Sequence, residues 1–274
     1  MAFALIQCYF SMLRETHCFF ADECARLESH GGTETQNLGA GHQESLLTHS
    51  DQPWLIAMRD ILRGFSTYHF HDTTPTARVR QFGYELDNKT LLFDGGNLAA
   101  FLVMIQREHP IHYRRIVETV RLVAPYFDDF VLTRTHRMQV YLDWHHMKSD
   151  MTFGAHQLSD GTLRAICLIT LLLQPPEKLP LVLIVDEPEL GLHPYALNLI
   201  ASLFRAASEH VQVIISTQSS TFLDHFDPED VIVAEHHDGK STFHRPGAEK
   251  LEAWLEEYSL GEVWEKNVIG GGPH

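Results

Sequence analysis

The chain has 274 residues, of which 44% are hydrophobic and 21% charged, proportions typical of a globular protein and not of a disordered or fibrous one. Its 21 Lys and Arg against 36 Asp and Glu give a net charge of −15, which argues against a passive binder of nucleic acid or of an anionic membrane. No apolar run approaches the roughly 20 residues that cross a bilayer. The four cysteines form no C-x-x-C pair and the N-terminal segment does not read as a signal peptide, so we expect a cytoplasmic protein.

The first 150 residues mix loops with a few amphipathic segments. Apolar residues predict a strand within 1–10, whereas Gly, Ser, Thr and Asn indicate a loop over 28–50. Asn97 is a candidate N-cap for the first of two helices, which end before Pro110 and Pro125. The other expected elements are a helix over 54–62, a turn ending at Pro75, and strands over 130–133 and 139–144.

From about residue 151 the chain alternates helices with short apolar strands. The runs LVLIV at 181–185 and VQVII at 211–215 are rich in β-branched residues and suit central strands buried on both faces. This alternation predicts an α/β fold with a mostly parallel sheet flanked by helices. The expected elements are helices over 162–173, 194–207, 220–225 and 248–258, strands over 181–185, 211–216 and 231–235, and a hairpin partner over 241–245.

Two adjacent carboxylates follow the first of these strands. In LVLIVDEP, the strand delivers Asp186 and Glu187 to its carboxyl end, which is where ligands bind in open α/β sheets. Asp186 could hold Mg²⁺, and Glu187 could polarise a water that attacks a phosphate. The alternative is a strand end that simply turns into solvent, where Asp, Glu and Pro are common.

A second motif, L-S-D-G-T at 158–162, precedes an apolar helix. Ser159 can cap the helix, and Gly161 lets the backbone approach a ligand closely. The helix N-terminus then offers free N–H groups to an anion such as phosphate. Taken alone, the motif is better explained as a plain N-cap.

Together these segments resemble the nucleotide-binding motifs of ABC-type ATPases. LSDGT resembles the signature motif usually written LSGGQ, LVLIVDEPELGLHP resembles the Walker B strand with the D-loop, and VIISTQSS at 213–220 resembles the switch segment. Their order and spacing are similar to those of the RecF/SMC/OLD-like branch, often described as AAA family ATPases. The resemblance implies a P-loop NTPase-like (ABC-type) partial fold, with a helical and irregular lid region on the N-terminal side.

The resemblance also implies roles in ATP hydrolysis, with ATP and Mg²⁺ as cofactors. Asp186 corresponds to the Walker B acid on the Mg²⁺ side, Glu187 to the general base and Gln218 to the switch residue that senses the γ-phosphate. Many relatives have His where Gln218 stands.

The signature and D-loop residues are implied to face a second subunit. Ser159, Gly161 and Thr162 would contact the γ-phosphate of ATP bound to that subunit, and His193 would lie in the D-loop across the dimer interface. Asp160 replaces the first signature glycine and Thr162 replaces the signature Gln, so the motif departs from its usual form at two positions.

A P-loop, G-x-x-x-x-G-K-[ST], does not occur in the sequence. The near match over 234–241 falls after the switch segment, and its Asp-Gly-Lys is better interpreted as a hairpin turn because a P-loop must open a helix. We therefore expect a chain that lacks the N-terminal lobe of the family, as a truncated, split or degenerate copy would. The expected organisation is a remnant of the lid or insertion region over 1–90, a helical subdomain with short strands over 91–150, and the signature, Walker B and switch lobe over 151–274.

The implied partners are a second ATPase subunit, either another copy or a chain that carries a P-loop, and by family analogy a nucleic acid or a nuclease, with no membrane. The alternative from another class is a non-catalytic pseudo-ATPase that acts as an interaction module. Three weaker interpretations concern particular side chains. They are a zinc site on His17, Cys18, Cys24 and His30, a metal pair on His69 and His71 against packing or turn hydrogen bonds, and a basic patch of Arg114, Arg115 and Arg121 against a solvated face.

Overall fold

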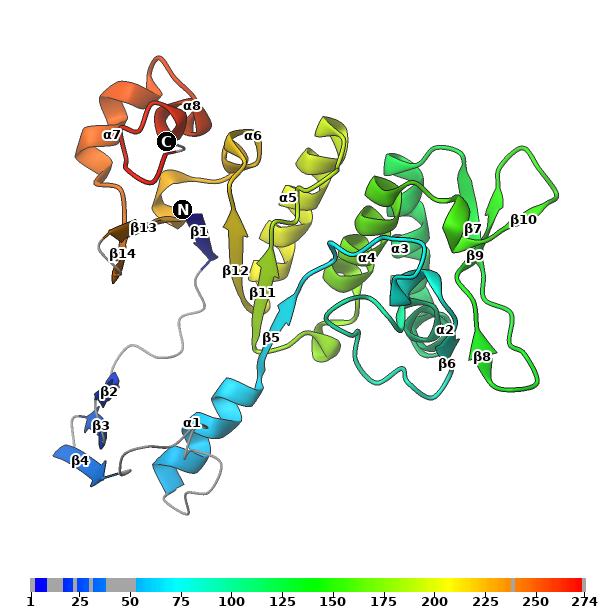
Figure 1. Ribbon diagram of the computed structural model, residues 1–274, viewed down its shortest axis with the longest axis horizontal. Coiled ribbons are helices and arrows are strands. Elements are labelled where there is room, and N and C mark those ends of the chain that lie inside the picture. Colours follow the sequence, from blue (N-terminus) through cyan, green and yellow to red (C-terminus); the bar gives the residue numbers. More distant parts are fainter. Residues whose placement is uncertain are drawn as a thin grey trace.

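A computed structural model describes residues 3–8, 17–21, 24–29, 32–37, 53–237 and 240–272 and shows an α/β fold (Figure 1). Its centre is a six-stranded sheet in the order β14-β13-β1-β12-β11-β5. The strands of this sheet are β1 (Phe3–Cys8), β5 (Phe65–Tyr68), β11 (Val182–Asp186), β12 (Gln212–Thr217), β13 (Val231–His237) and β14 (Lys240–His244).

Most strands of this sheet run in one direction, as the sequence predicted. β11 is parallel to both β5 and β12. β1 is antiparallel to both β12 and β13, so β13 points the same way as β12, and β14 then returns antiparallel to β13. The four strands β5, β11, β12 and β13 therefore share a direction, while β1 and β14 oppose them. The strand expected within residues 1–10 is β1.

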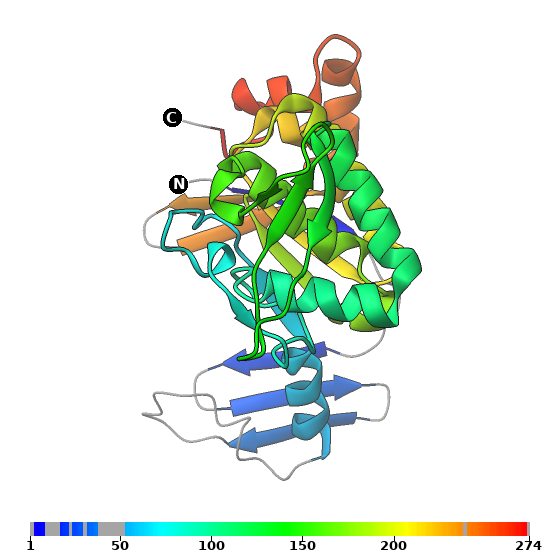
Figure 2. The same ribbon diagram turned by 90° about the vertical axis from the view of Figure 1, so that its right-hand side faces the viewer.

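Three long helices pack on one another beside the sheet. α3 (Pro110–Val123) contacts α4 (Asp160–Leu173), and α4 contacts α5 (Pro194–Ser208), which also lies on β12. Every residue of α4 from Ala165 to Leu173 is buried, because this helix is apolar on all sides and is covered on all sides. Seen from the side, α3 and its neighbour α2 (Leu98–Glu108) stand in front of the sheet (Figure 2). No helix among the described residues has the length and apolarity needed to span a bilayer.

The central strands are buried on one face and only partly buried on the other. Leu183 and Val185 of β11 and Val213 and Ile215 of β12 are almost fully inaccessible, whereas their neighbours in sequence are intermediate. The prediction that both faces are buried was therefore wrong for one face. A continuous run of β-branched residues does not reveal which alternate side chains are less covered.

The smaller elements surround this core. The remaining strands are β2 (His17–Ala21), β3 (Cys24–Ser29), β4 (Gly32–Asn37), β6 (Gly83–Tyr84), β7 (Phe127–Val131), β8 (Gln139–Val140), β9 (Asp143–His146) and β10 (Thr152–Phe153). The remaining helices of four residues or more are α1 (Pro53–Arg63), α6 (Ser220–Leu223), α7 (Ala248–Leu255) and α8 (Leu260–Glu265).

Two sequence expectations in these smaller elements were wrong. The loop expected over 28–50 contains β4, which pairs with β3 although its residues are polar, so composition alone misidentified a strand. The single strand expected over 139–144 is two strands, β8 and β9, which belong to different sheets.

Asn97 precedes α2 as predicted, but its side chain makes no capping bond. Its Oδ1 accepts the N–H of Leu92, and its Nδ2 donates to the carbonyl oxygens of Asp87 and Thr90 at 2.9 and 2.8 Å. The buried amide therefore holds the loop before the helix rather than the helix itself.

The segment with a near match to a P-loop is a hairpin, as predicted. β13 ends at His237 and β14 begins at Lys240, which pairs with His237. Lys240 thus starts a strand, whereas a phosphate-binding P-loop lysine opens a helix.

Replacing Leu183 by Ala should lower the free energy of unfolding by about 2–5 kcal/mol, because the side chain is fully buried and its loss leaves a cavity in the sheet's packed face. Urea unfolding measures the change. The matched control is Leu181→Ala two residues earlier, where the side chain is 62% exposed and the loss should stay within about 0.5 kcal/mol. Equal losses in the two variants would contradict this assignment of the core.

Candidate active site

The candidate site lies where three parallel strands end side by side. Asp186 at the end of β11 pairs in register with Ser216 of β12, and Val185 pairs with Tyr68 of β5. The residues that follow each strand therefore meet at one edge of the sheet, as expected for the ligand-binding edge of an open α/β fold.

Asp186 is held by contacts from both neighbouring strands. The Ser216 hydroxyl donates a short hydrogen bond to Asp186 Oδ1. The other oxygen, Oδ2, lies 3.7 Å from His69 Nε2, and the backbone carbonyl of Asp186 lies 3.1 Å from His71 Nε2. The carboxylate remains 40% exposed, so it is fixed in place yet open to a ligand.

Glu187 and Gln218, predicted from separate motifs, lie in direct contact. Gln218 Nε2 donates to Glu187 Oε1 at 3.0 Å. The Glu187 N–H donates to the carbonyl of Ser216 at 2.9 Å. The φ of Glu187 is 40°, in the left-handed region that residues other than glycine rarely adopt. Backbone strain of this kind is found at functional sites, where the surrounding structure enforces it.

Glu189 is an acid at the site that sequence analysis missed. Thr217 Oγ1 donates to Glu189 Oε1 at 2.6 Å, while Glu189 Oε2 is buried and has no hydrogen-bond partner among the described residues. Burial raises the pKa of this carboxyl above its ordinary value, more than the Thr217 hydrogen bond lowers it. Its signal in the sequence is a third acid in D-E-P-E, directly after the two that were singled out.

The signature motif begins α4 as predicted. Ser159 is the N-cap, and its Oγ accepts the N–H of Thr162 at 3.2 Å. The Thr162 hydroxyl shares hydrogen bonds with Ser159 Oγ at 2.9 Å and with Tyr126 OH at 3.1 Å. The cap fixes the direction in which the first N–H groups of α4 point.

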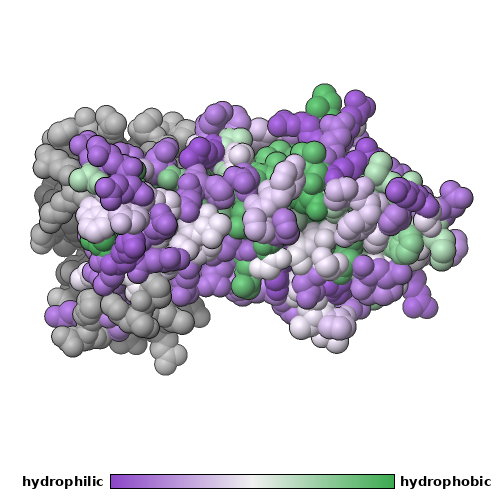
Figure 3. Space-filling model, turned by 90° about the horizontal axis from the view of Figure 1, so that it is seen from above, coloured by the Kyte–Doolittle hydropathy of each residue, from purple (hydrophilic) through white to green (hydrophobic). Residues whose placement is uncertain are grey.

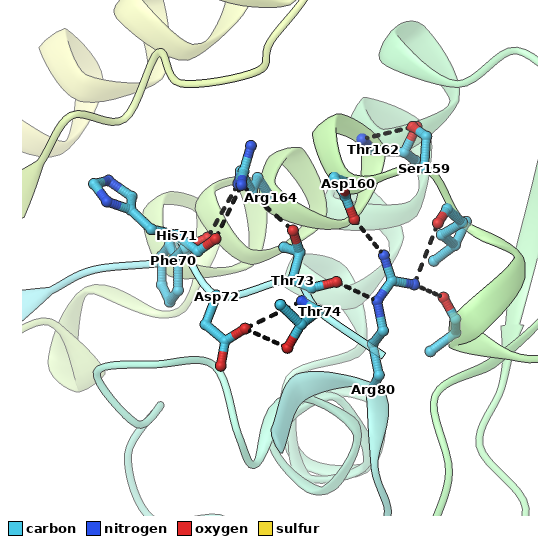
Figure 4. A network of polar contacts seen from close by, with 12 residues as sticks. Phe70, His71, Asp72, Thr73, Thr74, Arg80, Ser159, Asp160, Thr162 and Arg164 are labelled. Carbon is cyan, nitrogen blue, oxygen red and sulfur yellow. Dashed lines mark hydrogen bonds and ion pairs between the residues drawn. The ribbon is translucent and has the colours of Figure 1, made fainter. Parts of the chain in front are cut away.

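Asp160, the residue that departs from the usual signature, is paired with Arg80 (Figure 4). Arg80 Nη2 donates to Asp160 Oδ1 at 2.7 Å, and this contact holds the pKa of the carboxyl below its usual range. Arg80 also donates to the carbonyl oxygens of Thr73, Leu158 and Ala155, and its side chain is only 6% exposed. The negative charge added to the motif is therefore compensated inside the chain.

Gly161 is required by a backbone contact within the chain. A Cβ at this position would collide with the carbonyl oxygen of Gly191, which itself has a φ of 72°. The sequence suggested that this glycine allows a ligand to approach, and the structure shows the D-loop backbone approaching it.

Arg164, one turn into α4, joins the signature helix to two other segments (Figure 4). Its guanidinium donates to the carbonyl oxygens of Phe70 at 3.3 Å and His71 at 2.9 Å in the loop after β5. It also donates to the carbonyl of Leu190 in the D-loop at 3.2 Å. Neither Arg80 nor Arg164 belongs to one of the recognised motifs, which is why sequence analysis did not select them.

His193 caps the helix that follows the D-loop. Its Nδ1 accepts the N–H of Tyr195 at 3.2 Å, and Pro194 occupies the first turn of α5. This places the predicted D-loop residue at the start of α5, with the Tyr195 side chain 56% exposed beside it.

A pocket of about 740 Å³ lies beside the signature motif. Its wall includes the loop 71–75, the two arginines Arg80 and Arg164, and Ser159 and Asp160 at the start of α4. The guanidinium groups and the helix N-terminus favour an anion, whereas Asp72 and the Asp160 carboxylate that pairs with Arg80 oppose one.

The sequence family described as "AAA domain, putative AbiEii toxin, Type IV TA system" matches residues 60–224, more than half of the chain. The chain belongs to this AAA-domain family. The match spans the signature, Walker B and switch segments, which confirms the resemblance drawn from those motifs. No curated protein sequence matches the chain.

Solved structures show the same fold. An SMC head bound to the C-winged helix domain of ScpA superposes with a TM-score of 0.50 at 13% identity, covering 85% of this chain and 69% of that one. A structure from work on ATP-driven dimerization of SMC ATPases gives a TM-score of 0.44 at 18% identity, over 57% and 96% of the two chains. The Smc head domain with an extended coiled coil from Pyrococcus furiosus gives a TM-score of 0.43 at 18% identity, over 57% of this chain and 39% of that one. The fold of this AAA-family chain is thus similar to that of the SMC head bound to ScpA.

The structure bears on two of the three weaker interpretations. His69 and His71, interpreted as a metal pair or as residues of packing or turn hydrogen bonds, lie beside Asp186 with their ring centroids 3.8 Å apart. Arg121 donates to the carbonyl and carboxylate of Asp128, which favours a solvated, locally paired face over a basic patch. The zinc interpretation falls on side chains of residues 17–30 that lie outside the described part.

Replacing Arg164 by Leu should lower the free energy of unfolding by at least about 2 kcal/mol, since several carbonyl groups lose a charged donor at once. Hydrogen exchange should accelerate at 70–73 and 189–192 but not in α2. Arg114 on α3 is exposed, so Arg114→Leu is the matched control and should change neither the free energy of unfolding nor the hydrogen exchange of these segments. Unchanged exchange in both segments would show that Arg164 does not hold them together.

The pKa shift of Glu189 predicts a pH-dependent stability. Because the pKa is raised above 4.5 in the folded state, the unfolded chain releases the proton first, so the wild type loses stability as pH rises above about 4.5. The unfolding free energy of wild type relative to Glu189→Gln should therefore fall between pH 4.5 and pH 7.5 in urea titrations. Glu209 is exposed, so Glu209→Gln controls for the loss of a negative charge. If the difference in unfolding free energy between wild type and Glu189→Gln does not change with pH, the pKa of Glu189 is not raised in the folded state.

Proposed function

We propose that this chain supplies the signature, Walker B and switch elements of a composite site that binds and hydrolyses ATP. The observation that carries the proposal is the 3.0 Å hydrogen bond from Gln218 to Glu187 beside the fixed carboxylate of Asp186. The family and the fold support it, because both are those of ATPases.

The roles follow from the positions of the side chains. Glu187 accepts a proton from the attacking water, and the Gln218 amide orients both the carboxylate and that water. Asp186 provides an oxygen ligand of the kind that Mg²⁺ prefers, fixed by Ser216 and partly open to solvent. Bound Mg²⁺ would neutralise charge on the phosphate oxygens.

The signature residues serve a nucleotide held by a second subunit. Ser159, Gly161 and Thr162 would lie against a γ-phosphate at the start of α4, where the Thr162 N–H is already bonded to the Ser159 cap, and His193 lies in the D-loop that would face the same subunit. Arg80 cancels the charge of Asp160, which would otherwise repel that phosphate. The P-loop that cradles the β-phosphate would come from a chain that contains one, since this sequence has none.

The second candidate is a non-catalytic interaction module that docks through its D-loop. The supporting observation is the exposure of apolar side chains there, with Leu190 42% and Tyr195 56% exposed. Viewed from above, the molecule shows apolar residues gathered in the middle of a mostly hydrophilic face (Figure 3). A nucleic acid or a nuclease is a partner of the ATPase candidate instead, by analogy with the family alone.

The test is Mg²⁺-dependent ATP turnover. The chain alone should hydrolyse ATP no faster than background, and co-expression with an ATPase subunit that carries a P-loop and binds this chain should restore turnover. Glu187→Gln should then reduce the rate at least about 100-fold while nucleotide binding persists, because only the base is lost. The exposed Glu209→Gln is the matched control and should retain the rate.

Two outcomes would overturn the proposal. Rapid turnover by the chain alone, abolished by Glu187→Gln, would show that no P-loop from another chain is needed. A partner that binds equally well with and without nucleotide, in a complex that never hydrolyses ATP, would establish the non-catalytic module instead.

A further inference from the structure

We propose that His69, His71 and Asp186 form a binding site for a divalent transition-metal ion such as Zn²⁺, Co²⁺ or Mn²⁺. One ligand atom from each residue lies within 4.8 Å of the other two. The histidines follow β5 and the aspartate ends β11, and these strands are adjacent and parallel, so the sheet itself brings the three side chains together.

The spacing of the ligand atoms fits a metal. Two ligands about 2.0–2.2 Å from a tetrahedral ion are separated by roughly 3.3 Å. His69 Nε2 and Asp186 Oδ2 are 3.7 Å apart, so only a small rotation of one side chain is needed for both to reach one ion. The rings of His69 and His71 lie 3.8 Å apart, centroid to centroid, at an angle of 42°.

The ligand types select the class of ion. Mg²⁺ prefers oxygen ligands alone, whereas two imidazoles with one carboxylate suit Zn²⁺, Co²⁺, Mn²⁺ and Fe²⁺. Three protein ligands leave coordination positions open for water or a phosphate oxygen. Both His69 and Asp186 are partly exposed, at 49% and 40%, so an ion can reach them from solvent.

Surrounding groups already hold the three side chains in position, as hydrogen bonds to the ligating residues do in metal sites. Ser216 donates to Asp186 Oδ1 and leaves Oδ2, the atom nearest His69, without that contact. His71 Nε2 lies within hydrogen-bond distance of the Asp186 carbonyl, and a ring that donates one N–H keeps a lone pair on its other nitrogen. Arg164 fixes the backbone at His71 by donating to its carbonyl oxygen.

This inference shares Asp186 with the proposed ATP site but does not rest on it, because it requires no nucleotide. It adds two imidazole ligands to the carboxylate, so that without nucleotide the three residues together prefer a transition-metal ion to Mg²⁺. The occupied site would stand directly beside Glu187, whose backbone N–H is held by Ser216.

The test is metal binding by the untagged chain without nucleotide. Co²⁺ titration followed by visible absorption, and Zn²⁺ titration by calorimetry, should reveal one site per chain that survives a large excess of Mg²⁺. His69→Ala and His71→Ala should each weaken that site at least tenfold and reduce the visible Co²⁺ bands. The matched controls are His136→Ala, which is exposed, and His156→Ala, which lines the neighbouring pocket, and both should bind as wild type.

Binding that is unchanged in His69→Ala and His71→Ala, or equally weakened in the controls, would overturn the proposal, as would the absence of any binding. Circular dichroism spectra of the variants show whether each is folded, and Asp186→Asn gives a third, conservative disruption. A negative result would leave the Glu187→Gln turnover experiment unaffected, so the two proposals fail separately.

Discussion

The guanidinium of Arg164 is the contact on which the site depends. It projects from the first turns of α4 and donates both to the loop that leaves β5 and to the D-loop that leaves β11. One cation on the signature helix therefore joins two segments that are distant in sequence, and each of these two gives it a carbonyl oxygen that would otherwise need another donor. The signature helix, the histidines and the D-loop keep a common frame because of this side chain.

Charge balance explains why the unusual signature motif is tolerated. An aspartate at the helix N-terminus is favourable for the helix itself, because it faces the positive end of the dipole, but it is unfavourable for a phosphate arriving there. The buried Arg80 resolves this conflict by pairing with Asp160 and by bonding the carbonyl groups around it. The wall of the pocket beside the motif therefore has balanced charges, with Arg80 and Arg164 against Asp72 and Asp160, in a chain whose overall charge is −15.

The sequence predicted those parts of the site that are local in the chain. The strand that ends at Asp186 and the helix capped by Ser159 follow from periodicity and capping, whereas Glu187 and Gln218 were selected through the family resemblance and their contact was not predicted. Arg80, Arg164 and Glu189 were missed because their roles arise from contacts across the fold or from burial, which leave no local pattern. The polar strand β4 was missed for a related reason, since strand pairing rather than composition defines it.

The contact between Gly161 and Gly191 makes two distant positions a single mutational unit. A side chain at the first is excluded by the backbone of the second, and a φ of 72° disfavours a side chain at the second as well. A side chain at Gly161 would force the signature helix and the D-loop apart, and one at Gly191 would displace the Arg164 guanidinium that joins them. A substitution in either motif is therefore felt by the other, although the two lie about 30 residues apart in the sequence.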